Sequence, residues 1–171
     1  MRIEYHRTLI ADKARNEALF AALDRVIVKG KSVVADIGAG SGLLGLMASK
    51  LGAKDVHMYE ASAEVASVAA AVLKQNRARN CHLYPCRSTE MLDAPQADII
   101  ISETLGNYAL EENILETLAD AIDRILKPGG TVIPSRISQF VCPVTSPRLA
   151  NEMNAWRDVG HGLDLEPART M

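Results

Sequence analysis

Two glutamates in the segment IISETLGNYALEEN, residues 100–113, have the spacing that most directly suggests chemistry. Glu103 ends an apolar run, and Glu112 follows nine positions later, beyond Gly106. A carboxylate at the end of a buried strand is costly unless it has a cationic partner. Two carboxylates can bind a planar guanidinium from two sides and leave one nitrogen better able to attack an electrophilic methyl group. The spacing alone equally allows ordinary acids at the start of a helix.

A glycine-rich turn, DIGAGSG at residues 36–42, is a second candidate binding element. Gly38, Gly40 and Gly42 lie between an expected strand and an expected helix, where missing side chains let a ligand approach backbone N–H groups. The third glycine comes one position earlier than in the dinucleotide fingerprint, so the turn alone is a weak indication of a nucleotide. A tight strand-to-helix turn without a ligand would need the same glycines.

Glu60 ends the next apolar run, eighteen residues after Gly42. An acid at the end of a second strand can accept hydrogen bonds from both hydroxyls of a ribose, or it can be a solvated carboxylate. Asp36 precedes the glycine turn, and the segment LKPGGTVIPS at 126–135 follows the last long helical pattern. The combination is more specific than any one of its parts.

The hydrophobic periodicity predicts the elements that must position these residues. Expected strands cover residues 32–38, 56–60, 81–85, 97–102, 131–135 and 137–144. Expected helices cover residues 9–28, 39–52, 62–78 and 111–130, the first closed by Gly30 and the last stopped by Pro128 and Gly129. Strands that alternate with helices in this way predict an α/β fold, with a mostly parallel sheet covered by helices on both faces.

Composition narrows the function classes. The 171 residues, 48% of them hydrophobic, are enough for one globular domain with a core. The net charge of -2 gives no basic field for nucleic acid. Cys81, Cys86 and Cys142 lack disulfide or zinc spacing, and no run is long and apolar enough for a membrane helix. We therefore expect a cytoplasmic protein with no metal, nucleic-acid or membrane partner.

Taken together, the glycine turn, Glu60 and the glutamate segment resemble class I S-adenosylmethionine-dependent methyltransferases, and more narrowly the protein arginine methyltransferases. The segment SETLGNYALEEN is similar to the double-glutamate loop of that family, with Glu103, Gly106 and Glu112 at matching places. The N-terminal segment YHRTLIADKAR and the tail WRDVGHGLDL are also similar to family segments. The resemblance therefore covers nearly the whole chain.

The resemblance implies a Rossmann-like class I methyltransferase fold with S-adenosylmethionine as cofactor and S-adenosylhomocysteine as product. Glu103 and Glu112 would be the catalytic residues, Arg15 would bind the cofactor carboxylate, and Glu60 would bind the ribose. The further cofactor-binding positions that it implies are His6, Asp36, Gly38, Gly40, Gly42, Ser88 and Thr89.

The chain departs from the family pattern in several places. The family acid that contacts the adenine amino group falls on Thr89, with Glu90 beside it, and Thr104 and Asn107 replace a bulky Trp and Tyr. We expect an N-terminal helical segment at 1–30, a cofactor domain at 31–135, and the start of a largely missing β-barrel at 136–171. Either the chain is a piece of a longer protein, or the apolar residues of this last segment are covered by another copy or by a partner. These apolar residues should favour self-association into a homo-oligomer. They are Phe140, Val141, Trp156 and Leu163.

Three functions stay open on these grounds. The leading hypothesis is an N-methyltransferase that acts on the guanidino nitrogen of an arginine-containing protein. A second keeps the chemistry but has a small-molecule amine or guanidino compound as the acceptor. A third is a cofactor-binding interaction module without turnover.

Overall fold

The structure is a computed structural model, and it describes residues 3–106, 113–157 and 159–170. The chain divides into two compact units, Met1–Ser138 and Gln139–Met171. The domain limits that the sequence predicts at residues 30 and 135 stay predictions.

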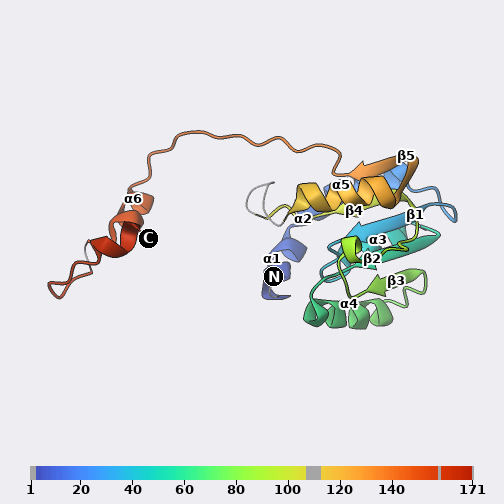
Figure 1. The fold of residues 1–171 in the computed structure, drawn as a ribbon, viewed down its shortest axis with the longest axis horizontal. Helices are drawn as coiled ribbons and strands as arrows, with labels where there is room; N and C mark the ends of the chain where they lie inside the picture. Colours follow the sequence, from blue (N-terminus) through green and yellow to red (C-terminus); the bar gives the residue numbers. More distant parts are fainter. Residues whose placement is uncertain (1–2, 107–112, 158, 171) are drawn as a thin grey trace. The chain divides into compact units, whose positions relative to one another are not determined.

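The first unit is built on a five-stranded parallel sheet (Figure 1). Its strands are β1 Val33–Ile37, β2 Asp55–Tyr59, β3 Cys81–Tyr84, β4 Ala97–Ser102 and β5 Leu126–Ile133, in the spatial order β3-β2-β1-β4-β5. The chain moves outward from β1 to β3 and then returns to β4 on the other side of β1. This reversal leaves a crevice at the carboxyl ends of β1 and β4, where ligands bind in open α/β sheets.

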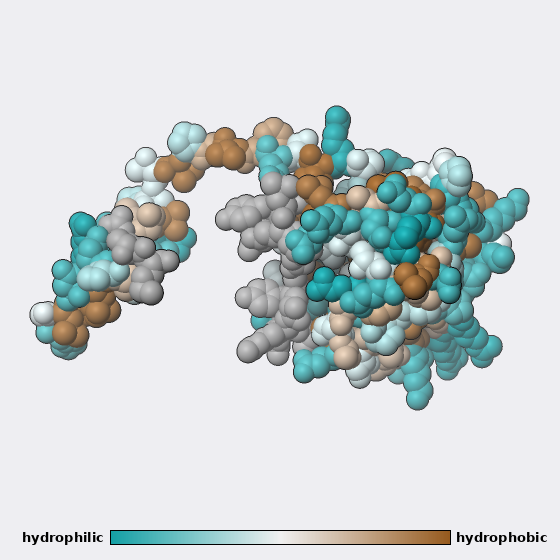
Figure 2. All heavy atoms as spheres, viewed as in Figure 1, coloured by the Kyte–Doolittle hydropathy of each residue, from teal (hydrophilic) through white to brown (hydrophobic). Residues whose placement is uncertain are grey.

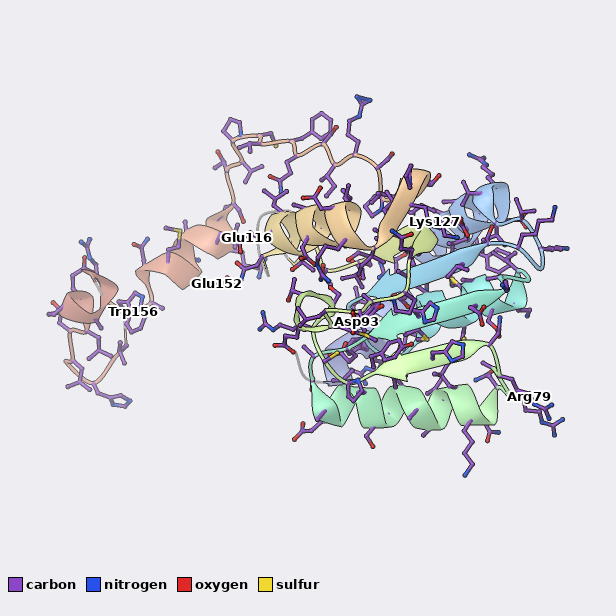
Figure 3. The ribbon with its side chains drawn as sticks, turned by 45° about the vertical axis from the view of Figure 1, so that its right-hand side comes forward. Arg79, Asp93, Glu116, Lys127, Glu152 and Trp156 are labelled. Atoms are coloured by element: carbon purple, nitrogen blue, oxygen red, sulfur yellow. The ribbon has the colours of Figure 1, made fainter. Side chains whose placement is uncertain are left out.

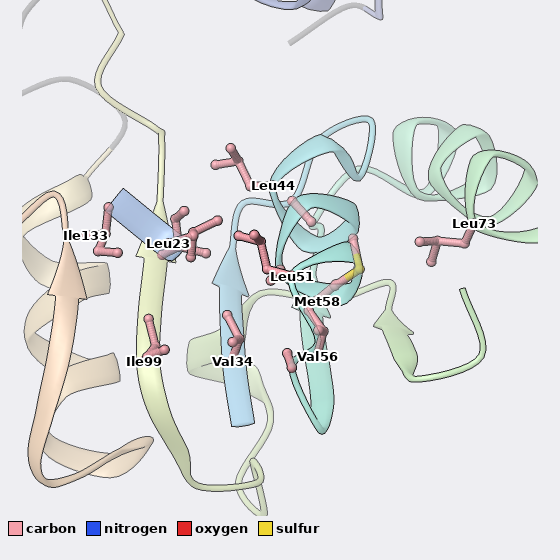
Figure 4. Close-up of a cluster of buried hydrophobic side chains, with 13 residues drawn as sticks. Leu23, Val34, Leu44, Leu51, Val56, Met58, Leu73, Ile99 and Ile133 are labelled. Atoms are coloured by element: carbon pink, nitrogen blue, oxygen red, sulfur yellow. The ribbon is translucent and has the colours of Figure 1, made fainter. Parts of the chain in front are cut away.

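Helices cover both faces of this sheet, which confirms the predicted fold class. The helices of this unit are α1 Ile3–Ala11, α2 Lys13–Val26, α3 Leu43–Lys50, α4 Ala63–Gln75 and α5 Ile114–Arg124, with the 3-10 helix η1 Ser88–Glu90 between β3 and β4. One apolar cluster joins α2, α3 and α4 to the sheet (Figure 4), and a second lies between the sheet and α5.

Alternation along each strand produces the two clusters. Val34 packs in the first cluster and Ala35 in the second, and Ile99 and Ile100 divide in the same way. Successive side chains of a strand point to opposite faces, so a strand buried on both faces must be apolar throughout. The continuous apolar runs in the sequence have this cause.

Three predicted elements differ in the structure. The helix predicted over 9–28 is two helices, because the Asp12 carboxylate accepts a hydrogen bond from Arg15 N at 3.0 Å and starts α2 there. The last long helix ends at Arg124, before Pro128, and the following residues belong to β5. There Ala97 N donates to Ile125 O at 2.8 Å, and a register shift lets the strand continue through the proline and glycines. Residues 137–144, predicted as a strand, form none.

The second unit contains α6 Pro147–Asn154 and the 3-10 helix η2 Glu166–Thr170. The segment before α6 carries exposed apolar side chains, with Phe140 at 93% and Val141 at 97% exposure, and Figure 2 shows hydrophobic residues along it. Within the described part of the chain, no helix combines the length and the apolar character that crossing a membrane requires.

Candidate functional site

A cavity of about 510 Å³ lies at the carboxyl ends of the strands in the first unit. Eight of the predicted site residues line it: His6, Arg15, Gly38, Gly40, Glu60, Ser88, Thr89 and Glu103. Asp36 and Gly42 do not line the cavity, and Glu112 lies outside the described residues. The fold therefore brings together residues that are up to 97 positions apart in the sequence (103 minus 6).

The glycine turn is held by hydrogen bonds to the end of β2. Gly38 N and Ala39 N donate to Tyr59 O at 3.0 and 2.9 Å, and Gly40 N donates to the Glu60 carboxylate at 2.9 Å. These three amides already have acceptors within the protein, so they are not the row of open donors that the sequence suggested. The approach of a ligand to this turn stays a prediction.

The glycines instead allow two neighbouring side chains to pack against the turn. Gly38 has a φ of +74° and Gly40 a φ of +55°. A Cβ at Gly38 would collide with the Thr104 methyl group, and one at Gly40 would collide with the His6 ring. Since both neighbours line the cavity, a larger residue at either glycine would change the cavity wall.

Glu60 is fixed at the end of β2 by two backbone donors. Its Oε2 accepts from Gly40 N at 2.9 Å and its Oε1 accepts from Ser62 N at 2.8 Å. An ionised carboxylate has about four acceptor positions, so two further donors can still bind. The residue therefore has the capacity that a ribose contact requires, and that contact stays a prediction.

Asp36 acts from behind the turn rather than in the cavity wall. Its side chain is buried, and one oxygen accepts from Gly45 N at 2.9 Å while Oδ1 has no partner among the described residues. Burial, opposed by the Gly45 hydrogen bond and assisted by the charge of Glu60, raises the pKa of Asp36 to about 7. The carboxyl group anchors the start of α3 beneath the glycine turn.

The cationic partner of Glu103 is Arg15. The Arg15 guanidinium donates to the Glu103 carboxylate, and also to Leu9 O at 3.1 Å and to Asn16 Oδ1 at 2.9 Å. Both side chains of the ion pair are about one-fifth exposed, at 21% and 19%. The Glu103 carboxylate thus binds a guanidinium in the cavity wall, although this one belongs to the chain itself.

A pair of hydroxyl groups, whose contacts the sequence analysis did not predict, fixes the backbone on both sides of Glu103. Ser102 Oγ donates to Ile37 O at 2.9 Å, and it lies 3.2 Å from Thr104 Oγ1. These contacts tie the end of β4 to the end of β1. The sequence shows the two hydroxyl residues beside the glutamate, but only the sheet order brings Ile37 next to them.

Another part of the cavity wall is formed by η1. Ser88 is 2% exposed, lines the cavity and has no hydrogen-bond partner for Oγ among the described residues. Tyr59, which the sequence analysis also missed, lines the cavity as well, and burial raises the pKa of its phenol to about 12. No group of three or more His, Cys, Asp or Glu residues in the described ranges is arranged to hold a metal ion.

The model of the family described as Ribosomal protein L11 methyltransferase (PrmA) matches residues 17–140. The chain belongs to this methyltransferase family. Its curated relatives include a probable protein arginine N-methyltransferase 6 of Arabidopsis thaliana, 34% identical over 94% of this chain and 37% of the relative. The protein arginine N-methyltransferase 6 of Xenopus tropicalis is 33% identical over 95% of this chain and 49% of the relative.

A solved structure has the same fold as this chain. The Trypanosoma brucei PRMT1 enzyme-prozyme heterotetrameric complex with AdoHcy matches with a TM-score of 0.84 and 28% identity, over 99% of this chain and 54% of that chain. The predicted resemblance to protein arginine methyltransferases and the Rossmann-like class I methyltransferase fold are confirmed. The chain spans less than half the length of the two curated relatives.

Proposed function

We propose that this chain binds S-adenosylmethionine in the cavity and catalyses methyl transfer to a guanidino nitrogen oriented by Glu103 and Glu112. The observation that carries the proposal is the Glu103 carboxylate, which lies in the cavity wall and pairs with a guanidinium. An acceptor arginine would present the same chemical group. The relatives named as protein arginine N-methyltransferases support this acceptor.

The residues of the cavity fit the cofactor. A volume of about 510 Å³ lies within the range of about 300–1,000 Å³ for small-molecule sites. Glu60 has acceptor positions left for ribose hydroxyls, and Ser88 Oγ lacks a partner. When bound, S-adenosylmethionine supplies an electrophilic methyl group on its sulfonium sulfur.

The protein has three tasks in this reaction. Glu103 holds the guanidinium and, with Glu112, draws its positive charge toward one part of the fork. The Ser102 and Thr104 hydroxyls keep the glutamate in place. Arg15 pairs with Glu103 here, and the cofactor carboxylate is the partner proposed for it in the complex. Transfer would form the N–CH3 bond while the S–CH3 bond of the sulfonium breaks, S-adenosylhomocysteine would be the thioether product, and the methylated guanidinium would lose a proton to solvent.

Calorimetry with S-adenosylhomocysteine, followed by mass spectrometry of candidate acceptors after incubation with S-adenosylmethionine, tests this function. The proposal expects binding and a mass gain on arginine peptides. A gain only on amine or guanidino metabolites would favour the small-molecule hypothesis. Binding without any turnover would favour the interaction module, and the absence of binding would overturn the cofactor assignment.

We also propose that the chain self-associates through the apolar side chains of its second unit. Phe140, Val141 and Val144 are more than two-thirds exposed, at 93%, 97% and 71%. Exposed apolar groups of this kind favour association. Light scattering at micromolar concentration should show a species larger than 18.5 kDa, and a monomer would contradict the proposal.

A further inference from the structure

Arg124, in the last turn of α5, makes four hydrogen bonds with its side chain. Its Nε and Nη2 donate to the two oxygens of Asp120 at 2.7 and 2.6 Å. Nη2 also donates to Ser88 O at 2.9 Å, and Nη1 donates to Met91 O at 3.0 Å. The guanidinium therefore joins α5 to both ends of η1, the segment between β3 and β4.

The segment that Arg124 holds is part of the cavity wall. Ser88 and Thr89 line the cavity, and the buried Ser88 Oγ has no partner among the described residues. Arg124 does not line the cavity. It binds η1 through backbone carbonyl groups, so it can act on a ligand only through the placement of η1.

The segments η1 and Glu103 follow strands at opposite ends of the row β3-β2-β1-β4. Glu103 follows β4, the glycine turn follows β1, Glu60 follows β2 and η1 follows β3, in the spatial order of the sheet. A ligand whose ribose contacts Glu60 therefore has its base toward η1 and its reacting end toward Glu103. The 3-10 helix η1 contacts α5, and Figure 3 labels Asp93 on the connection that leads from η1 to β4.

The fork of Arg124 suits this task better than a lysine would. Arginine has five N–H donors in a fixed plane, whereas lysine has one ammonium on a flexible stem. An i,i+4 ion pair with Asp120 uses only one edge of the guanidinium, and the remaining donors reach carbonyls three residues apart. Asp120 fixes the plane of the fork, and the fork fixes η1.

We propose that Arg124 is a positioning residue for the nucleoside end of the cavity, where it sets the position of Ser88 and Thr89 and thereby the affinity for the S-adenosyl ligand. This inference rests on the proposed function. The part of the ligand that η1 would contact is the adenine nucleoside. The amino-acid part of the ligand is outside the reach of η1.

The test compares the full chain with Arg124→Lys in calorimetric titrations with S-adenosylhomocysteine and with 5′-methylthioadenosine, which lacks the amino-acid part. We expect the dissociation constants of both ligands to rise by about tenfold and by the same factor, because the affected contacts lie at the nucleoside end. If Arg124 served folding alone, Arg124→Lys would lower the melting temperature without raising the two dissociation constants by the same factor. Asp120→Asn retains Arg124 but weakens the ion pair that orients its guanidinium, so it should lower the affinity for both ligands by a smaller factor. This variant provides the test if Arg124→Lys does not fold.

Arg148→Lys is the matched control, because Arg148 forms a comparable i,i+4 pair with Glu152 on α6. It should leave both dissociation constants unchanged. If the unmodified chain binds both ligands and the Arg124 and Asp120 variants bind them equally well, the positioning role is overturned while the proposed function stands. If the unmodified chain binds neither ligand, both proposals are overturned.

Discussion

The two sides of the cavity are held together by different kinds of contact. The turn side, Gly38 to Ser62, is held mainly by backbone groups, such as the donation from Gly38 N to Tyr59 O. The glutamate side depends on an ion pair between two side chains, Arg15 and Glu103, that are 88 residues apart. The turn side therefore follows from the pairing of β1 with β2, whereas the glutamate side can be altered without disturbing the sheet.

Glu103→Gln removes the negative charge on the glutamate side of the cavity. We expect this variant to have the largest effect, a loss of turnover. The substitution keeps the shape of the side chain but removes the charge that a guanidinium requires. We expect turnover to fall by about 10²–10⁴-fold, with the affinity for S-adenosylhomocysteine changed by less than about threefold, because this contact acts mainly in the transition state. Steady-state kinetics and calorimetry measure the two quantities. Normal turnover with the true acceptor would show that Glu103 is not catalytic.

Asp36→Asn tests the anchor beneath the turn side. The pKa of Asp36 is raised from 3.8 to about 7 in the native state. The native state therefore binds the carboxyl proton of Asp36 more tightly than the unfolded chain does. The extra stability that the bound proton gives the native state is present at low pH and is lost as the pH rises toward about 7. The free energy of unfolding should therefore fall by roughly 2–4 kcal/mol over that range. Urea unfolding at about pH 5 and pH 8 should show this fall in the unmodified chain and a smaller one in Asp36→Asn. Equal pH dependence in both proteins would contradict the raised pKa.

Glu60→Ala should weaken ligand binding on the turn side. The change removes the acceptor for Gly40 N and Ser62 N as well as the proposed ribose contact. We expect S-adenosylhomocysteine to bind about 1–3 kcal/mol more weakly, the scale for leaving polar partners unpaired. Glu60→Gln, which retains an acceptor oxygen, should lose less. Unchanged affinity in the alanine variant would exclude Glu60 as the ribose acid.

Thr104→Val should make the smallest change and sharpen the distinction between the two sides. The variant retains the methyl group against Gly38 but loses the hydroxyl next to Ser102. Turnover should fall by about threefold to tenfold, near the value of one hydrogen bond, while cofactor affinity stays the same. A loss of cofactor affinity instead would place Thr104 on the cofactor side of the site.

Local sequence was sufficient to place β1 to β4 and the glycine turn. The apolar runs that became β1, β2 and β4 are continuous because each strand is buried on both faces. The glycines of the turn follow a strand directly, and their positive φ angles need residues without a Cβ. These properties depend on neighbours along the chain, so periodicity and residue type reveal them.

Tertiary structure alone decided which side chains meet. Arg15 pairs with Glu103, and Arg124 reaches the carbonyls of Ser88 and Met91, through contacts that span 33 to 88 positions. The strand through Pro128 also depends on such a contact, because pairing with β4 replaces the helix that the local pattern favours. Contacts of this kind leave no periodic trace in the sequence, since the free energy of each pair depends on the sheet order that brings its members together.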